Sequence, residues 1–404
     1  MFPLSRTIIP VRRRTRIPES RVRTEFRMRT GFRCAAPPSR KPAQPGVPRF
    51  PHSSTILPNL NTSGVLLWKS QKMALPFMIL SSEAARVGQS PRRLASRAKA
   101  GELVRVRRGC YLPADEWSQL SARTRHLVRA AAYRHGTSIE PVFSDQSAAI
   151  LWNLPLLTVP EQLQVLTDDR RGGRSHGDVH KHLGRKDHNV VTISGFRCTD
   201  KIRTSTELAA KLPFAQAVAI IDQAMRAPSA VPEGALDSWD PELLARHPLN
   251  QPELRSYAVT LETESARRRA LAVIGFGSCD SESVGESMSR AQIHLLRLPP
   301  PELQQTFTLP DGRIARTDFY WRRLGIVGEF DGKEKYFRGD WAGGADPGER
   351  VYAEKLREDG LRALGLRVVR WTWADMMDLD RLGSLLHRAG LRAEPASSLN
   401  QRAN

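Results

Sequence analysis

The sequence predicts an α/β protein built from several domains, and three observations lead to this expectation. The chain has 404 residues, which is too long for one small domain. Hydrophobic residues make up 40% of the chain and charged residues 26%, which excludes a wholly disordered chain, a collagen-like fibre and a small disulfide scaffold. From about residue 73 to residue 390, segments with helical periodicity alternate with strand-like segments bounded by turn residues.

The first 72 residues carry much of the positive charge. The whole chain has 62 Lys and Arg against 42 Asp and Glu, a net charge of +20, and residues 1–72 hold 15 of these bases and 2 of these acids. This segment is also rich in proline, so we expect it to be disordered. Three interpretations are open. The segment is a nucleic-acid-binding arm, it is an organellar transit peptide, or its start codon is assigned too early and translation begins at Met73 or Met78. We favour the third interpretation because domain-like sequence begins there.

The four cysteines indicate a reducing, cytoplasmic setting. Cys34, Cys110, Cys198 and Cys279 lie far apart and form no C-x-x-C pair, so neither a zinc ribbon nor a disulfide framework is expected. We expect them to act as small buried hydrophobic residues. No stretch reaches 18 uninterrupted apolar residues, so the sequence predicts no transmembrane helix and no membrane partner.

Residues 73–116 read as a winged helix-turn-helix. A short helix from Met73, a second one ending at Gly88, and a third from Ser90-Pro91 to Gly101 are followed by strands at 103–106 and 110–112. A helix of this kind can enter the major groove of DNA, and arginines neutralise phosphates. The alternative is a solvated basic helix beside an ordinary hairpin. The expected nucleic-acid contacts are Arg92, Arg93, Arg97 and Lys99 on the helix, and Arg105, Arg107 and Arg108 on the hairpin.

Residues 117–235 read as a mixed α/β middle domain. Helices are expected near 118–135, 144–152, 205–212 and 214–226, and strands near 161–167, 178–183 and 189–198. His180 and His182 would share a strand face, but no further ligand recurs at a matching interval, so an exposed basic strand explains them better than a metal site. Residues 236–275 are expected to form a linker followed by a helix at 263–275.

Residues 276–391 carry the pattern with the most chemical content. A capped helix from Ser283 precedes strands at 304–309, 314–321 and 325–331, a helix at 348–364, a strand at 366–372 and a helix at 374–389. The order is α-β-β-β-α-β-α. Residues 392–404 are expected to be a disordered tail.

Four acids in this region form a candidate catalytic site. Glu329 and Asp331 are two residues apart on one strand and so share a face, Asp318 lies on the strand before, and Glu286 lies in the first turns of the helix. Clustered carboxylates favour Mg²⁺ or Mn²⁺, which would lower the pKa of a bound water and stabilise charge on a phosphate, with Lys335 close by. We expect Asp318, Glu329 and Asp331 to bind the metal; the alternative is unrelated acids on exposed strand ends.

Four motifs across residues 281–390 resemble an uncharacterised bacterial family related to the very-short-patch-repair endonucleases, within the PD-(D/E)XK nuclease superfamily. They are E-S-x-S-R, T-D-F, G-E-F-D-G-K-E-K-Y and E-K-L-R-E-D-G-L-R-A-L-G-L-R-V-V-R-W-T-W-A-D. The resemblance implies an αβββαβ restriction-endonuclease-like core with Asp318 and Glu329 as motif acids. Asp331 stands where the motif expects lysine, so Lys335 would replace it. Arg370 would face phosphate.

The N-terminal part also resembles a known family. V-G-Q-S-P-R-R-L-A-S-R-A-K-A-G-E-L-V-R-V-R-R-G-C-Y is similar to the winged-helix domain of AbiEi-type antitoxins, and S-D-Q-S-A-A-I-L-W-N-L-P-L looks like the middle domain of actinobacterial proteins with this layout. Two hypotheses follow. The chain is a metal-dependent DNA endonuclease guided by its winged helix, or an AbiEi-like antitoxin and transcriptional repressor with an inactive nuclease fold and a partner toxin.

Overall fold

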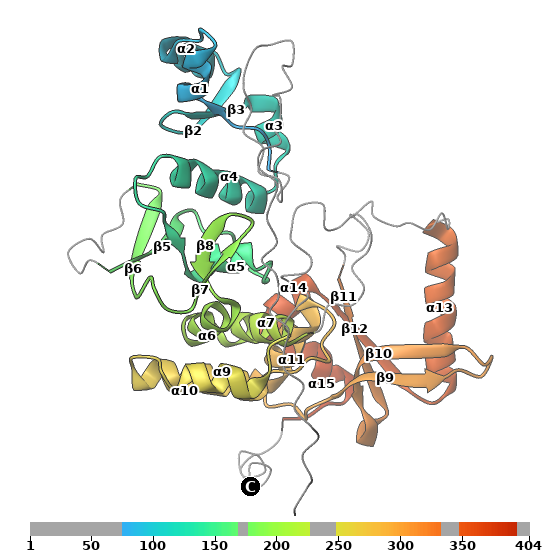
Figure 1. Ribbon diagram of the computed structural model, residues 1–404. Coiled ribbons are helices and arrows are strands. Elements are labelled where there is room, and N and C mark those ends of the chain that lie inside the picture. The colour runs from blue at the N-terminus through green and yellow to red at the C-terminus, as the bar shows by residue number, and fades with distance from the viewer. Residues whose placement is uncertain (1–74, 169–176, 227–247, 333–346, 394–404) are drawn as a thin grey trace, which may run out of the picture. The chain divides into compact units, whose positions relative to one another are not determined.

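The computed structural model describes residues 75–168, 177–226, 248–332 and 347–393 (Figure 1). The chain separates into two units, residues 1–57 and 58–404, and every described residue belongs to the second. The described residues contain thirteen α-helices and three β-sheets, one of them antiparallel and two mixed, so the expected α/β class is confirmed. The expectations for residues 1–72, for Lys335 and for most of the tail lie outside the described residues.

The first sheet has the order β1-β3-β2 and carries two short helices. A serine cap and a proline at the first helical position start α2, as predicted, because the Ser90 side chain accepts the Arg93 amide. The short helix expected from Met73 is wrong: residues 75–78 have no regular secondary structure, and residues 79–80 pair with β3 as a strand. The elements are β1 (Ile79–Leu80), α1 (Ser81–Arg86), α2 (Pro91–Lys99), β2 (Leu103–Arg107) and β3 (Cys110–Pro113).

The second sheet has the order β6-β5-β4-β8-β7 and is mixed. The single strand expected at 189–198 is two antiparallel strands instead, because Ser194 and Gly195 both take positive φ and turn the chain between them. The elements are α3 (Ala114–Gln119), α4 (Ala122–His135), β4 (Val142–Phe143), α5 (Asp145–Leu151), β5 (Leu163–Thr167), β6 (Val179–Leu183), β7 (Val190–Ile193) and β8 (Phe196–Thr199).

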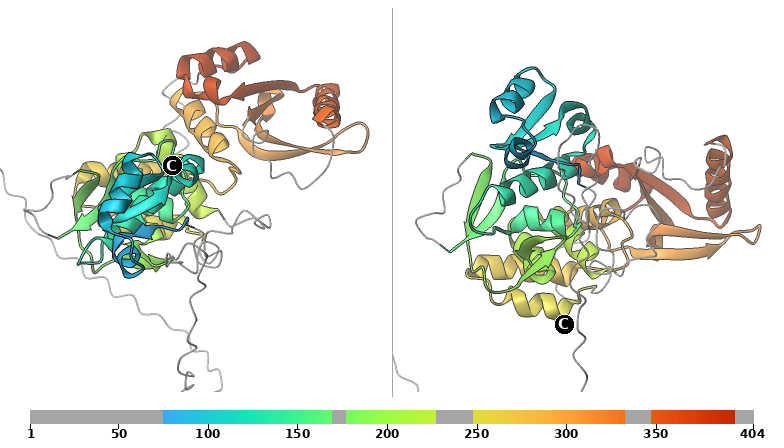
Figure 2. Two further views of the ribbon diagram at one scale, coloured as in Figure 1. Left: turned by 90° about the horizontal axis from the view of Figure 1, so that it is seen from above. Right: turned by 45° about the horizontal axis from the view of Figure 1, so that its top comes forward.

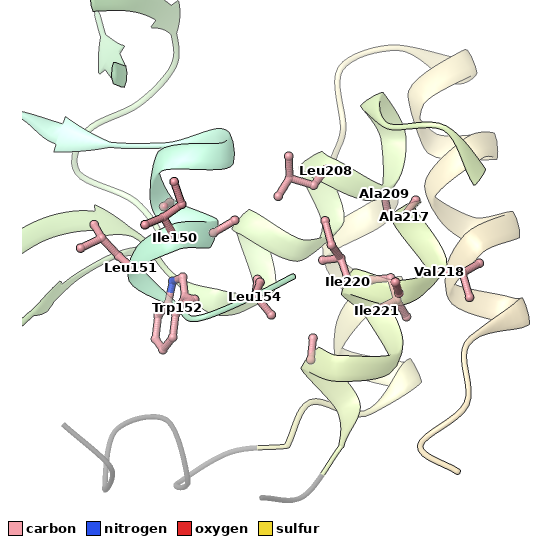
Figure 3. Packing of buried hydrophobic residues seen from close by; sticks show 14 of the residues in the cluster. Ile150, Leu151, Trp152, Leu154, Leu208, Ala209, Ala217, Val218, Ile220 and Ile221 are labelled. Atoms are coloured by element: carbon pink, nitrogen blue, oxygen red, sulfur yellow. The ribbon is translucent and has the colours of Figure 1, made fainter. Parts of the chain in front are cut away.

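Four helices follow this sheet and supply much of the apolar core. They are α6 (Lys201–Lys211), α7 (Phe214–Met225), α9 (Gln251–Ala258) and α10 (Glu264–Phe276). The expected linker contains α9, which begins with a capping box at Asn250 and Glu253 that the composition of the segment concealed. Figure 3 shows apolar side chains of α5, α6 and α7, among them Ile150, Leu208 and Ile220, gathered in one cluster.

The last sheet has the order β12-β11-β10-β9, with β11 and β12 parallel and the other pairs antiparallel. The predicted sequence of elements from the first helix to the last strand is confirmed. The helix expected at 374–389 is two helices, because Asp378 leaves helical geometry and caps the second. The elements are α11 (Val284–Leu295), β9 (Glu302–Thr308), β10 (Ile314–Trp321), β11 (Ile326–Asp331), α13 (Pro347–Ala363), β12 (Arg367–Thr372), α14 (Trp373–Met377) and α15 (Leu379–Ala389), with a 3₁₀ turn, η1 (Arg322–Leu324), between β10 and β11.

The two faces of this sheet present different kinds of side chain to the helices that pack on them. On the α11 side, the Trp371 indole N–H donates to Ser289 Oγ at 2.8 Å, and Gly285 lies against the Phe330 ring. On the α13 side, β11 and β12 present charged side chains, described below. Figure 2 shows α13 well apart from α14 and α15. No helix among residues 75–168, 177–226, 248–332 and 347–393 is long and apolar enough to cross a membrane.

Candidate functional site

Three of the four basic side chains of α2 have no acidic partner among the described residues. Arg92, Arg93 and Lys99 are exposed, and none of the three forms an ion pair with a described residue. Arg97 differs, because its Nε lies 2.8 Å from Glu102 Oε2. Leu94 points the other way and is fully buried against Ala84 and Leu103. One face of α2 therefore packs on the sheet, and the other offers three of its four predicted contacts to solvent.

The hairpin that follows α2 divides its three arginines. Arg105 and Arg108 are exposed and have no ion-pair partner among the described residues. Arg107 is half-buried: its Nη1 donates to Asp178 Oδ2 at 2.9 Å, and its guanidinium lies 4.6 Å from the centre of the Tyr133 ring. The predicted wing thus supplies two outward-facing arginines rather than three.

The predicted motif acid Glu329 sits in a network of ion pairs on the α13 side of the sheet. The carboxylate of this buried residue lies 2.6 Å from Arg357 Nη2 and 2.8 Å from Arg370 Nη2. Arg370 is paired with Glu329 in the parallel register of β11 and β12, which brings the two side chains to one face. Both arginines also contact Glu354 of α13, and Arg370 approaches Glu358.

The pKa values of Glu329 and Glu354 shift in opposite directions, although the arginines lower both. Burial raises the pKa of Glu329 above its ordinary value, and the two guanidinium groups only partly oppose this effect. Glu354 is less buried, so although burial raises its pKa, the hydrogen bonds and charges of Arg357 and Arg370 outweigh that and hold the pKa below its ordinary value. The negative charge of Glu329 is therefore balanced by two arginines of the chain itself.

The remaining predicted acids have separate surroundings. Glu286 is buried and serves as a helix cap: it accepts hydrogen bonds from the Ser283 hydroxyl, the Glu282 amide and the Gln304 side chain, at 2.7, 2.8 and 2.8 Å. Asp318 Oδ2 accepts the Phe330 amide at 2.8 Å, and so joins β10 to β11.

Alternation along β11 places Glu329 on the side of the sheet away from α11, the helix that carries Glu286. Phe330 faces Gly285 of α11, so its neighbour Glu329 faces the opposite side of the sheet, toward α13. Asp331 is half-buried at the end of β11. Within the described part of the chain, no group of three or more His, Cys, Asp or Glu side chains is arranged to hold a metal ion. The Mg²⁺ or Mn²⁺ site at Asp318, Glu329 and Asp331 therefore remains a prediction.

The residues that sequence reasoning missed are Glu354 and Glu358. Their signal was present, because Glu354 and Arg357 are three residues apart on one helix, a spacing that supports ion pairs, and Glu358 follows one residue later. What the spacing did not reveal is that Arg357 and Arg370 turn to the same strand acid, Glu329.

The two histidines on β6 form a small polar cluster. The rings of His180 and His182 have centroids 4.4 Å apart, so the expectation of a shared face is confirmed. His182 Nε2 is 3.2 Å from the Gln164 side-chain oxygen. Burial lowers the pKa of His182 to about 4, which keeps its imidazole neutral.

No family model matches the chain, and no curated protein matches it. Among solved structures, the chain is similar to the crystal structure of the RV2827C protein from Mycobacterium tuberculosis, with 13% sequence identity and a TM-score of 0.31. That match covers 52% of this chain and 75% of the other.

Proposed function

We propose that this chain is a DNA-binding regulator that contacts DNA through a winged helix-turn-helix formed by α1, α2 and the β2–β3 hairpin. One observation carries the proposal: Arg92, Arg93, Lys99, Arg105 and Arg108 are exposed and carry no acid partner among the described residues. Exposed cations on a helix and its adjoining hairpin can neutralise DNA phosphates and reach base edges.

The C-terminal domain supports a regulatory rather than a catalytic role in this proposal. A metal site built on Glu329 would have to displace two arginines, each within 2.8 Å of its carboxylate. We therefore propose that the chain acts as an AbiEi-like antitoxin or transcriptional repressor whose nuclease-like fold has lost its hydrolytic site, and whose partners are DNA and a cognate toxin.

The test is salt-dependent binding of the full chain to duplex DNA that includes its own promoter. Each arginine lost from a phosphate contact lowers the slope of log affinity against log salt by about 0.9. We expect Arg93→Gln to show that loss. Arg322→Gln is the matched control, because Arg322 is an exposed arginine already paired with Glu302. Equal slopes for both variants, or no binding by the unmodified chain, would reject the proposal.

A second candidate is metal-dependent cleavage of DNA by the C-terminal domain. It is favoured by the order of elements along the chain, α11-β9-β10-β11-α13-β12, which is the order that the sequence predicts, and by Asp318 and Asp331 on neighbouring strands. Nicking of DNA in Mg²⁺ or Mn²⁺ that disappears in Asp318→Asn and Asp331→Asn would favour this activity. If Asp331→Asn cuts as fast as the unmodified chain, that site plays no catalytic part.

A further inference from the structure

The β2–β3 hairpin contains one irregularity, which decides where its arginines face. Arg105 pairs with Tyr111, whereas Arg107 pairs with Cys110, so Val106 is an extra residue in β2. An extra residue of this kind is a β-bulge, and bulges turn the side chains that follow them. Residues directly opposite each other in an antiparallel pair point to the same face. Arg105 therefore shares a face with Tyr111, and Arg107 shares the other face with Cys110.

The two faces of the hairpin have different neighbours. Tyr111 belongs to the small apolar cluster with Leu94 of α2. Cys110 belongs to the main core, and its Sγ lies 4.0 Å from the Ala132 carbonyl of α4. The bulge consequently keeps Arg105 on the side of α2 and turns Arg107 toward α4. Without it, the two arginines, two residues apart, would share one face.

On the α4 side, Arg107 meets two partners. Asp178, the residue before β6, accepts its Nη1 hydrogen at 2.9 Å, and the Tyr133 ring of α4 lies 4.6 Å from its guanidinium carbon. Only 25% of the Arg107 side chain is exposed. Asp178 also acts on α4, since burial lowers the pKa of Arg129 there and the Asp178 charge opposes that shift. Arg107 thus joins the hairpin to α4 and β6 through one charge and one aromatic face.

We propose that Arg107 is a positioning residue that clamps the hairpin against α4, and that Arg105 and Arg108 are the hairpin residues that contact DNA phosphates. This inference rests on the DNA-binding function proposed above. The clamp fixes the orientation of the hairpin relative to α4, so its loss lowers affinity without removing a phosphate contact.

Salt titration of DNA binding by the full chain separates the two roles. We expect Arg105→Ala to lower the salt slope by about 0.9, which corresponds to a change of about 3–4-fold in relative affinity between about 50 and 200 mM salt. Arg107→Ala and Asp178→Asn should each weaken binding with the slope unchanged, and their combination should weaken it no further. Arg107→Glu with Asp178→Arg should recover affinity. If Arg107→Ala lowers the slope as Arg105→Ala does, while Asp178→Asn has no effect, the clamp is refuted.

A second measurement tests the clamp without DNA, so that its failure is distinguishable from failure of DNA binding. In urea unfolding of the full chain, Arg107→Ala and Asp178→Asn should be non-additive, because the two side chains share one contact. The matched pair, Arg105→Ala with Asp178→Asn, should be additive. Additive effects in the first pair would overturn the clamp even if the chain binds DNA, and non-additive effects would support it even if no DNA binds.

Discussion

The buried ion pair between α7 and α11 gives the sharpest stability prediction. Asp222 is 1% exposed, and both of its carboxylate oxygens accept from Arg290 Nη2, at 2.9 and 2.8 Å. Its Oδ1 also accepts the Ser278 amide at 2.8 Å. Arg290 donates to the Phe276 carbonyl at 2.7 Å and lies 4.3 Å from the centre of the Phe276 ring. One carboxylate therefore holds a buried guanidinium and a loop amide together.

We predict that Asp222→Ala lowers the free energy of unfolding by about 3–5 kcal/mol, the range for removal of one partner from a buried ion pair. The loss comes from the buried, uncompensated Arg290 charge, together with about 1–3 kcal/mol for an amide left without its acceptor, and the two contributions overlap. Burial raises the pKa of Asp222 even beside Arg290, so the ionised carboxylate is itself costly to bury. For that reason Asp222→Leu with Arg290→Met should restore most of the lost stability.

The assay is urea unfolding followed by far-ultraviolet circular dichroism, with the slope against urea compared between variants. The matched control is Glu264→Ala, which removes an acid 77% exposed and paired with Arg267 on α10; we expect a change within about 1 kcal/mol. A loss below about 1 kcal/mol for Asp222→Ala would contradict the argument that this pair is desolvated.

Three further outcomes are expected. Glu329→Gln should make the free energy of unfolding depend less on pH. Burial raises the pKa of Glu329 in the folded state, so the stability that Glu329 contributes is complete below the ordinary carboxyl pKa and is lost as pH rises through the folded-state pKa. Burial lowers the pKa of His126 to about 4, so folding stability should fall by up to about 3 kcal/mol as pH drops from about 6.5 to about 4, and His126→Gln should remove that slope in pH-dependent unfolding. Gly285→Ala should cost about 1–3 kcal/mol in urea unfolding, because a Cβ there would lie 1.9 Å from the Phe330 ring; adding Phe330→Leu should relieve it, and an unchanged variant would contradict the packing.

Local signals in the sequence predicted much of the element order. The side chains of Ser90 and Ser283 each accept the backbone amide three residues further along the chain. These caps can therefore be predicted without any distant contact. The two errors have different causes, a distant strand partner in one case and an overlooked local signal in the other. Residues 79–80 form a strand because β3 is available to pair with them, and α9 begins at a capping box inside a segment whose proline content indicated a linker.

The candidate site was predicted less well than the fold. The family resemblance implied roles for Glu329 and Arg370, but not that Arg370 and Arg357 neutralise the acid. That outcome depends on a parallel register joining residues 41 apart in the chain and on the packing of α13 against β12. The same limit applies to Arg107, whose partner Asp178 is 71 residues away.

The sequence by itself determined the alternation of helices and strands, the concentration of bases on α2 and its hairpin, and the placement of acids on β10 and β11. Only the tertiary structure decided which of those charges are paired. Periodicity fixes the face on which a side chain lies, whereas pairing depends on what packs against that face. A single extra residue, Val106, is enough to send one of two neighbouring arginines to α4 and leave the other on the side of α2.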